Sequence, residues 1–125
     1  MNRLWTLFCI LFLFACSGKS SDWHGGADSN NNGVRDDIDS WIEKKAKGDE
    51  RLKKALTNLA KINPAKCEYS IKAKCLDQLS DDGIFLQIEL LDLQLNTKEL
   101  RAEFEGNIKK CPQIDDRKIN YKCDL

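Results

Sequence analysis

Apolar residues recur at helical spacing over most of the chain between residues 38 and 110. The first stripe predicts a helix over 38–47 that Gly48 ends, and it consists of Ile38, Trp41, Ile42 and Ala46. Asp49 then stands where the N-cap of a second helix is expected, and Pro64 stops that helix. The apolar stripe of the second helix consists of Leu52, Ala55, Leu56, Leu59, Ala60 and Ile62.

A third helix is predicted over 65–79, and the polar turn 80–83 follows it. Its face would carry Cys67, Ile71, Cys75 and Leu79. The next run, 84–95, alternates apolar and polar residues over 86–90 as a strand does. It also repeats apolar residues at helical spacing, at Ile84, Ile88, Leu91 and Leu95. Its length favours a helix, because strands usually span roughly four to eight residues and a lone strand would have no partner.

The last helix is expected to start at a capping box, with Asn96 as the cap and Glu99 at the third helical position. It would run to about Lys110 and bury the stripe Leu100, Phe104 and Ile108, and Pro112 would end it. The tail 113–125 is expected to be irregular and held through Cys123. The sequence therefore predicts one all-α domain over 28–125, a small bundle of four to five helices braced by disulfides.

The N-terminal segment has the pattern of a lipoprotein signal. The run 4–15 is apolar except for Thr6, which suits a signal peptide and is too short for a membrane span. The residues Leu13-Phe14-Ala15-Cys16 read as a bacterial lipobox. We expect removal of 1–15, acylation of Cys16 and a flexible tether over 16–27. The alternatives are an ordinary signal peptide or an uncleaved anchor. No aspartate follows Cys16, which favours the outer over the inner membrane of a bacterial envelope.

Four cysteines remain after export: Cys67, Cys75, Cys111 and Cys123. In an oxidising compartment an even number predicts two disulfides. If Cys67 and Cys75 share a helix, they lie about 12 Å apart along its axis, beyond the reach of a direct bond. We then expect nested pairing, Cys67 with Cys123 and Cys75 with Cys111. A turn between Cys67 and Cys75 would restore local pairing. Zinc is disfavoured, because the spacing is wrong and the single histidine lies in the tether.

Charge and composition exclude some functions. Basic residues dominate 44–74 and acidic residues dominate 77–105, a pattern that usually reflects neighbouring helices attracting each other. The alternative, a basic patch that binds anionic lipid or nucleic acid, is disfavoured because the basic segment lacks interleaved aromatics except Tyr69. No serine–histidine–aspartate set is present, and His24 in a tether is a poor general base. We therefore expect no enzymatic activity.

The stretch 28–39 has the composition of a calcium loop. Calcium is bound by about six to eight oxygen ligands in flexible geometry. Side-chain oxygens stand at positions 1, 3 and 5 of the stretch, at Asp28, Asn30 and Asn32, with Gly33 at the sharp turn. The remaining ligands would be the carbonyl of Val34 and the side chains of Asp36 and Asp39. The alternative is an Asx-rich turn with an N-capping aspartate and no metal.

This stretch resembles the calcium loops of EF-hands, dockerins and thrombospondin type 3 repeats. The resemblance implies the ligand set Asp28, Asn30, Asn32, Val34, Asp36 and Asp39. Arg35 stands where EF-hands carry an aliphatic residue that pairs two loops, and Asp39 replaces their bidentate glutamate. Aspartate at that position suits the other two families better. The low charge predicts weak, structural calcium binding, with a dissociation constant of roughly 10⁻⁴ to 10⁻³ M.

A wider resemblance covers two short motifs. The loop with the following residues 37–42, and the later Asn-Thr-Lys-Glu at 96–99, are similar to a group of exported proteobacterial proteins. That resemblance implies no known activity. We expect a non-catalytic, lipid-anchored interaction module of the envelope, with candidate surfaces at 44–54 and 77–92 and another envelope or effector protein as partner. The alternative is a protective lipoprotein of the kind encoded on plasmids, phages or beside toxins, which acts in entry exclusion or neutralises a periplasmic effector.

Overall fold

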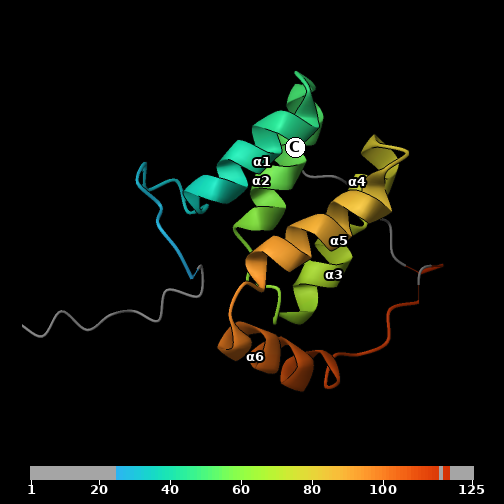
Figure 1. Cartoon of the computed structure of the whole chain (residues 1–125). Helices are drawn as coiled ribbons and strands as arrows, with labels where there is room; N and C mark the ends of the chain where they lie inside the picture. The colour runs from blue at the N-terminus through green and yellow to red at the C-terminus, as the bar shows by residue number, and fades with distance from the viewer. Residues whose placement is uncertain (1–24, 116, 119–125) are drawn as a thin grey trace, which may run out of the picture.

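The computed structural model describes residues 25–115 and 117–118. Within them the chain forms helices and no strand (Figure 1). The helices are α1 (Asp36–Ala46), α2 (Glu50–Ala60), α3 (Cys67–Ala73), α4 (Cys75–Leu79), α5 (Gly83–Gln94) and α6 (Lys98–Ile108). The predicted all-α class is confirmed. The predicted signal peptide, Cys16, most of the tether and Cys123 lie outside the described residues.

The turn between α1 and α2 follows the sequence signals closely. Lys47 and Gly48 both adopt left-handed backbone conformations, with φ of 50° and 87°, and so reverse the chain after α1. The Asp49 carboxylate then accepts hydrogen bonds from the backbone N–H groups of Arg51 and Leu52, at 3.0 and 3.1 Å. Asp49 is therefore the N-cap that the sequence predicts, and α1 packs closely against α2.

The stretch predicted as a third helix is interrupted at Lys74. The N–H of Asp77 donates to the carbonyl of Lys74 at 3.3 Å, a tighter turn than an α-helix makes. If α3 and α4 are counted as one interrupted helix, the described residues form a bundle of five helices. The core-facing side is formed by Tyr69, Ala73 and Leu76. Ile71, on the side of the cysteines, is exposed.

Residues 84–94 of the ambiguous run lie in helix α5 and Leu95 is its C-cap, so the strand alternative is wrong. Its first residue, Gly83, packs directly on α4: a Cβ atom there would lie 2.6 Å from the Cα of Asp77. Only glycine allows this approach. Leu86 and Leu90 of α5 enter the core beside Val34, Ile38, Ile42 and the stripe of α2. The apolar side chains of Ile84, Phe85 and Ile88 point outward and are 59–66% exposed.

A buried polar network joins α5 to α2 and α3. Gln94 is 2% exposed, and its Oε1 accepts a hydrogen bond from the Tyr69 hydroxyl at 2.7 Å. Its Nε2 donates to the carbonyls of Ala60 and Ile62, at 3.1 and 3.3 Å. Burial raises the pKa of Tyr69 well above its usual range. Among the described residues no buried side-chain nitrogen or oxygen lacks a partner.

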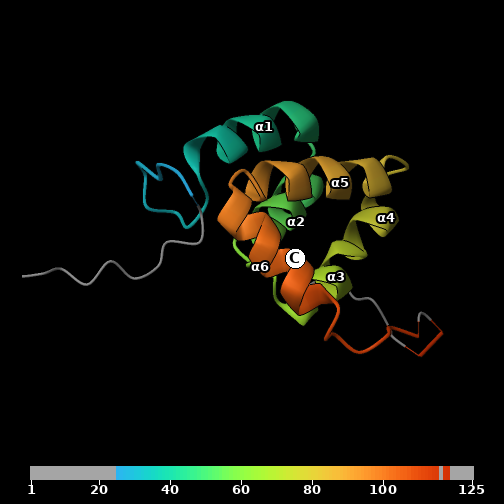
Figure 2. The same cartoon turned by 60° about the horizontal axis from the view of Figure 1, so that its bottom comes forward.

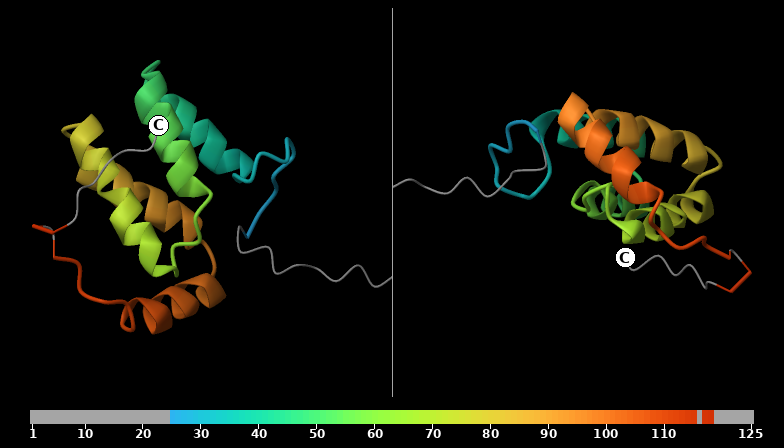
Figure 3. Two further views of the ribbon diagram at one scale, coloured as in Figure 1. Left: turned by 180° about the vertical axis from the view of Figure 1, so that it is seen from behind. Right: turned by 90° about the horizontal axis from the view of Figure 1, so that it is seen from below.

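Helix α6 lies outside the core, at the edge of the bundle beside α3 and α5 (Figures 2 and 3). None of residues 98–108 is fully buried, so the predicted burial of Leu100, Phe104 and Ile108 is wrong; all three are half-buried. The cap also differs from the prediction. The hydroxyl of Thr97 accepts from the N–H of Leu100 at 3.2 Å. Asn96 instead donates to the carbonyl of Gly25, because its side chain turns back to the N-terminal segment.

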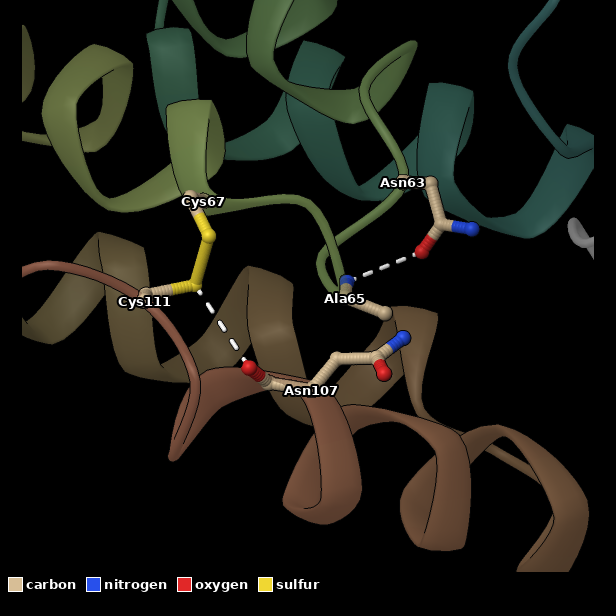
Figure 4. Close-up of a disulfide and its surroundings, with 5 residues drawn as sticks. All are labelled: Asn63, Ala65, Cys67, Asn107 and Cys111. Carbon is tan, nitrogen blue, oxygen red and sulfur yellow. Dashed lines mark hydrogen bonds between the residues drawn. A yellow bond between two sulfur atoms is a disulfide. The ribbon is translucent and has the colours of Figure 1, made fainter.

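A disulfide joins Cys67, at the start of α3, to Cys111, just beyond α6 (Figure 4). The two Cα atoms are 5.4 Å apart. Cys75 is disulfide-bonded as well. The nested pairing is therefore wrong, because Cys111 bonds to Cys67 and not to Cys75. The turn Asn63–Ala65, in which Asn63 Oδ1 accepts from the N–H of Ala65 at 2.8 Å, starts α3 close to the end of α6.

Candidate metal centre

The predicted calcium loop immediately precedes α1, and its first half is folded around Asp28. The two carboxylate oxygens of Asp28 accept from the backbone N–H groups of Asn32 and Gly33, at 3.1 and 2.9 Å. Gly33 has a φ of 84°, which favours glycine, and Asn31 is also left-handed at 54°. These two residues curl the backbone so that its N–H groups point at the carboxylate.

The two asparagines orient the middle of the loop. Asn30 Oδ1 accepts from the N–H of Asn32 at 3.0 Å, and Asn32 Oδ1 accepts from the N–H of Val34 at 2.7 Å. Both side-chain amides also donate to Oδ2 of Asp39, at 3.2 and 2.8 Å. The first turn of α1 carries Asp39 back to the loop, as the sequence predicts. The structure therefore brings Asn30, Asn32 and Asp39 into direct contact, with Asp28 bonded to the same backbone.

Asp36 has a different environment from the other predicted ligands. Its carboxylate accepts from the Ser29 hydroxyl at 2.6 Å and from the Ser29 N–H at 2.9 Å. These bonds hold the pKa of Asp36 below its usual range, with the hydroxyl as the larger cause. The N–H of Asp36 donates to the carbonyl of Ala27 at 2.8 Å. Asp36 thus closes the loop on Ser29, a contact that the ligand pattern did not reveal.

Val34 and Arg35 attach the loop to the bundle. Val34 is completely buried in the core. Arg35 is 4% exposed, and its guanidinium donates to the Asp37 carboxylate and to the carbonyl of Leu93, each at 2.8 Å from Nη2. The Arg35 hydrogen bonds lower the pKa of Asp37. Because Leu93 lies in the last turn of α5, the cation also meets the negative end of that helix.

Arg35 holds the loop against the rest of the bundle. At this position the EF-hand pattern has an aliphatic residue that pairs two loops. Here Arg35 reaches 58 residues along the chain to α5. The departure from the pattern is therefore a docking contact within one domain. Sequence reasoning noted Arg35 as a mismatch and missed this role, because the partner is a backbone carbonyl that leaves no signal in the sequence.

The donor atoms of the loop are oxygens, which suit a hard cation better than a transition metal. Within residues 25–115 and 117–118, no three Asp, Glu, His or Cys side chains gather so as to hold a metal ion. The loop offers instead carboxylate, amide and backbone oxygens, which suit a hard cation. A bound ion would compete with the amide groups of Asn30 and Asn32 for the Asp39 carboxylate. That competition favours weak affinity.

The surroundings of the loop hold a second charged contact. Trp41 Nε1 donates to Glu89 at 3.1 Å, and the Lys45 ammonium lies 2.6 Å from the same carboxylate oxygen and 5.9 Å from the centre of the Trp41 ring. Lys45 and Trp41 together lower the pKa of Glu89, with Lys45 the larger cause. This contact joins α1 to α5. Trp41, which is fluorescent, thus lies on α1, the helix that follows the loop.

No helix in the described part of the chain combines the length and apolar character needed to cross a membrane. No protein-family model, no curated protein and no solved structure matches the chain.

Proposed function

We propose that the chain is a non-catalytic, lipid-anchored protein of the bacterial envelope in which the loop 28–39 is a structural calcium site. The observation that supports the calcium proposal is that the loop holds Asn30, Asn32 and Asp39 side by side, through hydrogen bonds that the two side-chain NH2 groups donate to the carboxylate. Asp28 and Asp36 add two further carboxylates within the same twelve residues. In a compartment with millimolar calcium, a weak site of this kind is filled.

Calcium in this position stabilises the bundle and does not switch it. The loop is already joined to the core through Val34 and to α5 through Arg35. A ligand that binds the folded loop adds stability in proportion to its saturation. With a dissociation constant near 1 mM, 10 mM calcium adds about 1.4 kcal/mol. For a domain of this size that corresponds to a rise in Tm of roughly 5–10 °C.

The test is a titration of the full chain in detergent with calcium or magnesium, after removal of metal with EDTA. We expect Tm to rise and to saturate near millimolar calcium, with little response to magnesium. The variant Asp39→Asn should lose the response. The matched control Asp92→Asn makes the same change on the exposed face of α5 and should keep it. A flat titration of the unmodified chain, or an equal response of Asp39→Asn, would refute the calcium site.

The anchor has its own test. Lipidation at Cys16 predicts a mature protein that lacks residues 1–15, carries acyl chains and fractionates with the outer membrane. Cys16→Ser should retain the N-terminal segment and gain no lipid. Intact-mass spectrometry separates these outcomes. Lipid-free mature protein that begins at another residue would contradict the anchor and leave the calcium proposal untouched.

The interaction role is supported by the outward face of α5. Isolated exposed apolar side chains are common, but Ile84, Phe85 and Ile88 are neighbours on one helical face. This face lies within the acidic segment 77–92 that the sequence indicates as a candidate surface. We propose another envelope protein as its partner. A photo-crosslinker at position 88 should capture one defined envelope protein in intact cells. Phe85→Ser should abolish that product, and its persistence would argue against this face.

A further inference from the structure

We propose that α6 is a strap held across an apolar groove by the Cys67–Cys111 disulfide, and that reduction of this bond by a dithiol releases it. The bond connects two segments 44 residues apart in sequence, one at the start of α3 and one beyond the end of α6. Figure 4 shows that it spans the space between the two elements. The proposal does not depend on calcium or on the lipid anchor.

The packing of α6 is weak compared with that of the other helices. None of residues 98–108 is fully buried, and the principal helix contacts of the bundle join α1 to α5 without α6. An isolated helix of 11 residues is marginal in water, so α6 depends on contacts outside itself. At its N-terminal end, Arg101 donates to the carbonyl of Leu95 at 2.7 Å. Just beyond its C-terminal end, Cys111 is attached covalently to Cys67.

The surface beside α6 is mainly apolar and incompletely filled. Phe104 of α6 borders two open hollows of about 310 and 240 Å³, the first of which is also lined by the charged side chains of Asp92, Arg101 and Glu105. Leu91 of α5 lines both hollows, and Tyr69 and Ala73 of α3 line the second. Ile88 also lines both and continues into the exposed face of α5. Withdrawal of Phe104 would therefore join the groove to that face in one larger apolar surface.

The bond is placed where a reductant can reach it. Cys67 is exposed, whereas Cys111 is half-buried. A thiolate of the dithiol attacks Sγ of Cys67, the Cys67–Cys111 bond breaks, and Cys111 leaves as a thiolate that takes up a proton. The second thiol of the reductant then displaces Cys67 from the mixed disulfide. The protein gains two electrons and two protons, and the dithiol becomes a disulfide.

Reduced Cys111 has a local partner in its own turn. Its Sγ lies 3.6 Å from the carbonyl oxygen of Asn107 (Figure 4). In the disulfide this sulfur carries no hydrogen and the contact is not a hydrogen bond. After reduction the thiol can donate to that carbonyl. The same carbonyl already accepts from the N–H of Lys110 at 2.9 Å, so the end of α6 keeps a backbone hydrogen bond when Cys67 is released.

The first test is hydrogen exchange of the full chain, comparing the unmodified protein with the double variant Cys67→Ser, Cys111→Ser. We expect the amides of 98–108 to lose at least tenfold of their protection, while those of α2 keep theirs. Binding of an apolar fluorescent dye should increase in parallel. Unchanged protection of α6 would overturn the proposal. An equal loss in α2 would also overturn it, since the disulfide would then brace the whole domain.

A second measurement keeps the test decisive if the double variant folds poorly. The unmodified protein is exposed to increasing dithiothreitol under native conditions, and free thiols are alkylated and located by peptide mass. Loss of protection in α6 should follow alkylation of Cys67 and Cys111. If it follows alkylation of Cys75 instead, or if α6 stays protected after Cys67 and Cys111 are both alkylated, the strap proposal is wrong.

Discussion

Gln94 should be among the residues whose substitution destabilises the fold most. In Gln94→Leu the new side chain is similar in volume, so the loss comes mainly from polar groups and not from a cavity. The Tyr69 hydroxyl loses its acceptor at 2.7 Å, and the carbonyl of Ala60 loses its donor at 3.1 Å. Tyr69 and Ala60 are only 4% and 1% exposed, so water does not readily replace the missing partner.

The expected loss in free energy of unfolding follows from the number of buried polar groups that lose their hydrogen-bond partner. Each buried polar group left without a partner costs about 1–3 kcal/mol. Two such groups make the expected loss in free energy of unfolding about 2–6 kcal/mol for Gln94→Leu, because the carbonyl of Ile62 is less buried and adds little. Tyr69→Phe leaves a single acceptor, Oε1 of Gln94, unsatisfied and should cost about 1–2 kcal/mol.

A double-mutant cycle isolates the contact. In the Gln94→Leu background, Tyr69→Phe removes a buried hydroxyl that is already unpaired, so it should restore about 1–3 kcal/mol of stability. The coupling free energy should therefore be about 2–5 kcal/mol. Urea unfolding followed by helical circular dichroism measures all four proteins. Gln87→Leu is the matched control on the same helix, because Gln87 contacts Asp77 at the surface, and it should cost below about 0.5 kcal/mol.

Two results would refute this reasoning. If Gln94→Leu is as mild as Gln87→Leu, the buried amide does not stabilise the junction of α2, α3 and α5. If Tyr69→Phe costs the same in both backgrounds, the hydroxyl and the amide do not depend on each other. Either result would show that apolar packing alone holds the three helices together.

Further substitutions test other parts of the structure. Gly83→Ala should lower Tm by roughly 4–15 °C, because its Cβ would press on the α4 backbone, whereas Gly106→Ala, with nothing within 4 Å, should leave Tm unchanged or raise it. Asp49→Ala should cost about 1 kcal/mol in urea unfolding, and Asp49→Ser should restore most of it. Glu89 has a lowered pKa, so its contact with Lys45 stabilises the fold above the usual value of 4.5 and is lost as pH falls below it. Glu89→Gln should therefore reduce stability slightly at pH 7 and have a smaller effect near pH 3; an equal effect at both pH values would contradict the ion pair.

Much of the fold was predictable because its signals are local. The apolar stripe of α2, the cap at Asp49 and the turn at Gly48 lie within a few residues of the structure that they specify. The disulfide pairing was not predictable, because it depends on where the start of α3 meets the end of α6. The burial of α6 was overestimated for a related reason. An amphipathic stripe indicates which face turns inward, but it does not indicate how much of a core remains to receive it.

The candidate site shows the same division between local and distant information. Twelve consecutive residues contain all the proposed ligands, and the structure brings Asn30, Asn32 and Asp39 among them into contact. The position that departed from the familiar pattern, Arg35, proved to attach the loop to α5. A residue that breaks a motif can therefore mark the place where the motif meets the rest of the fold. Because this contact ends on a backbone carbonyl of α5, changes in the side chain of Leu93 should disturb the loop far less than loss of Arg35.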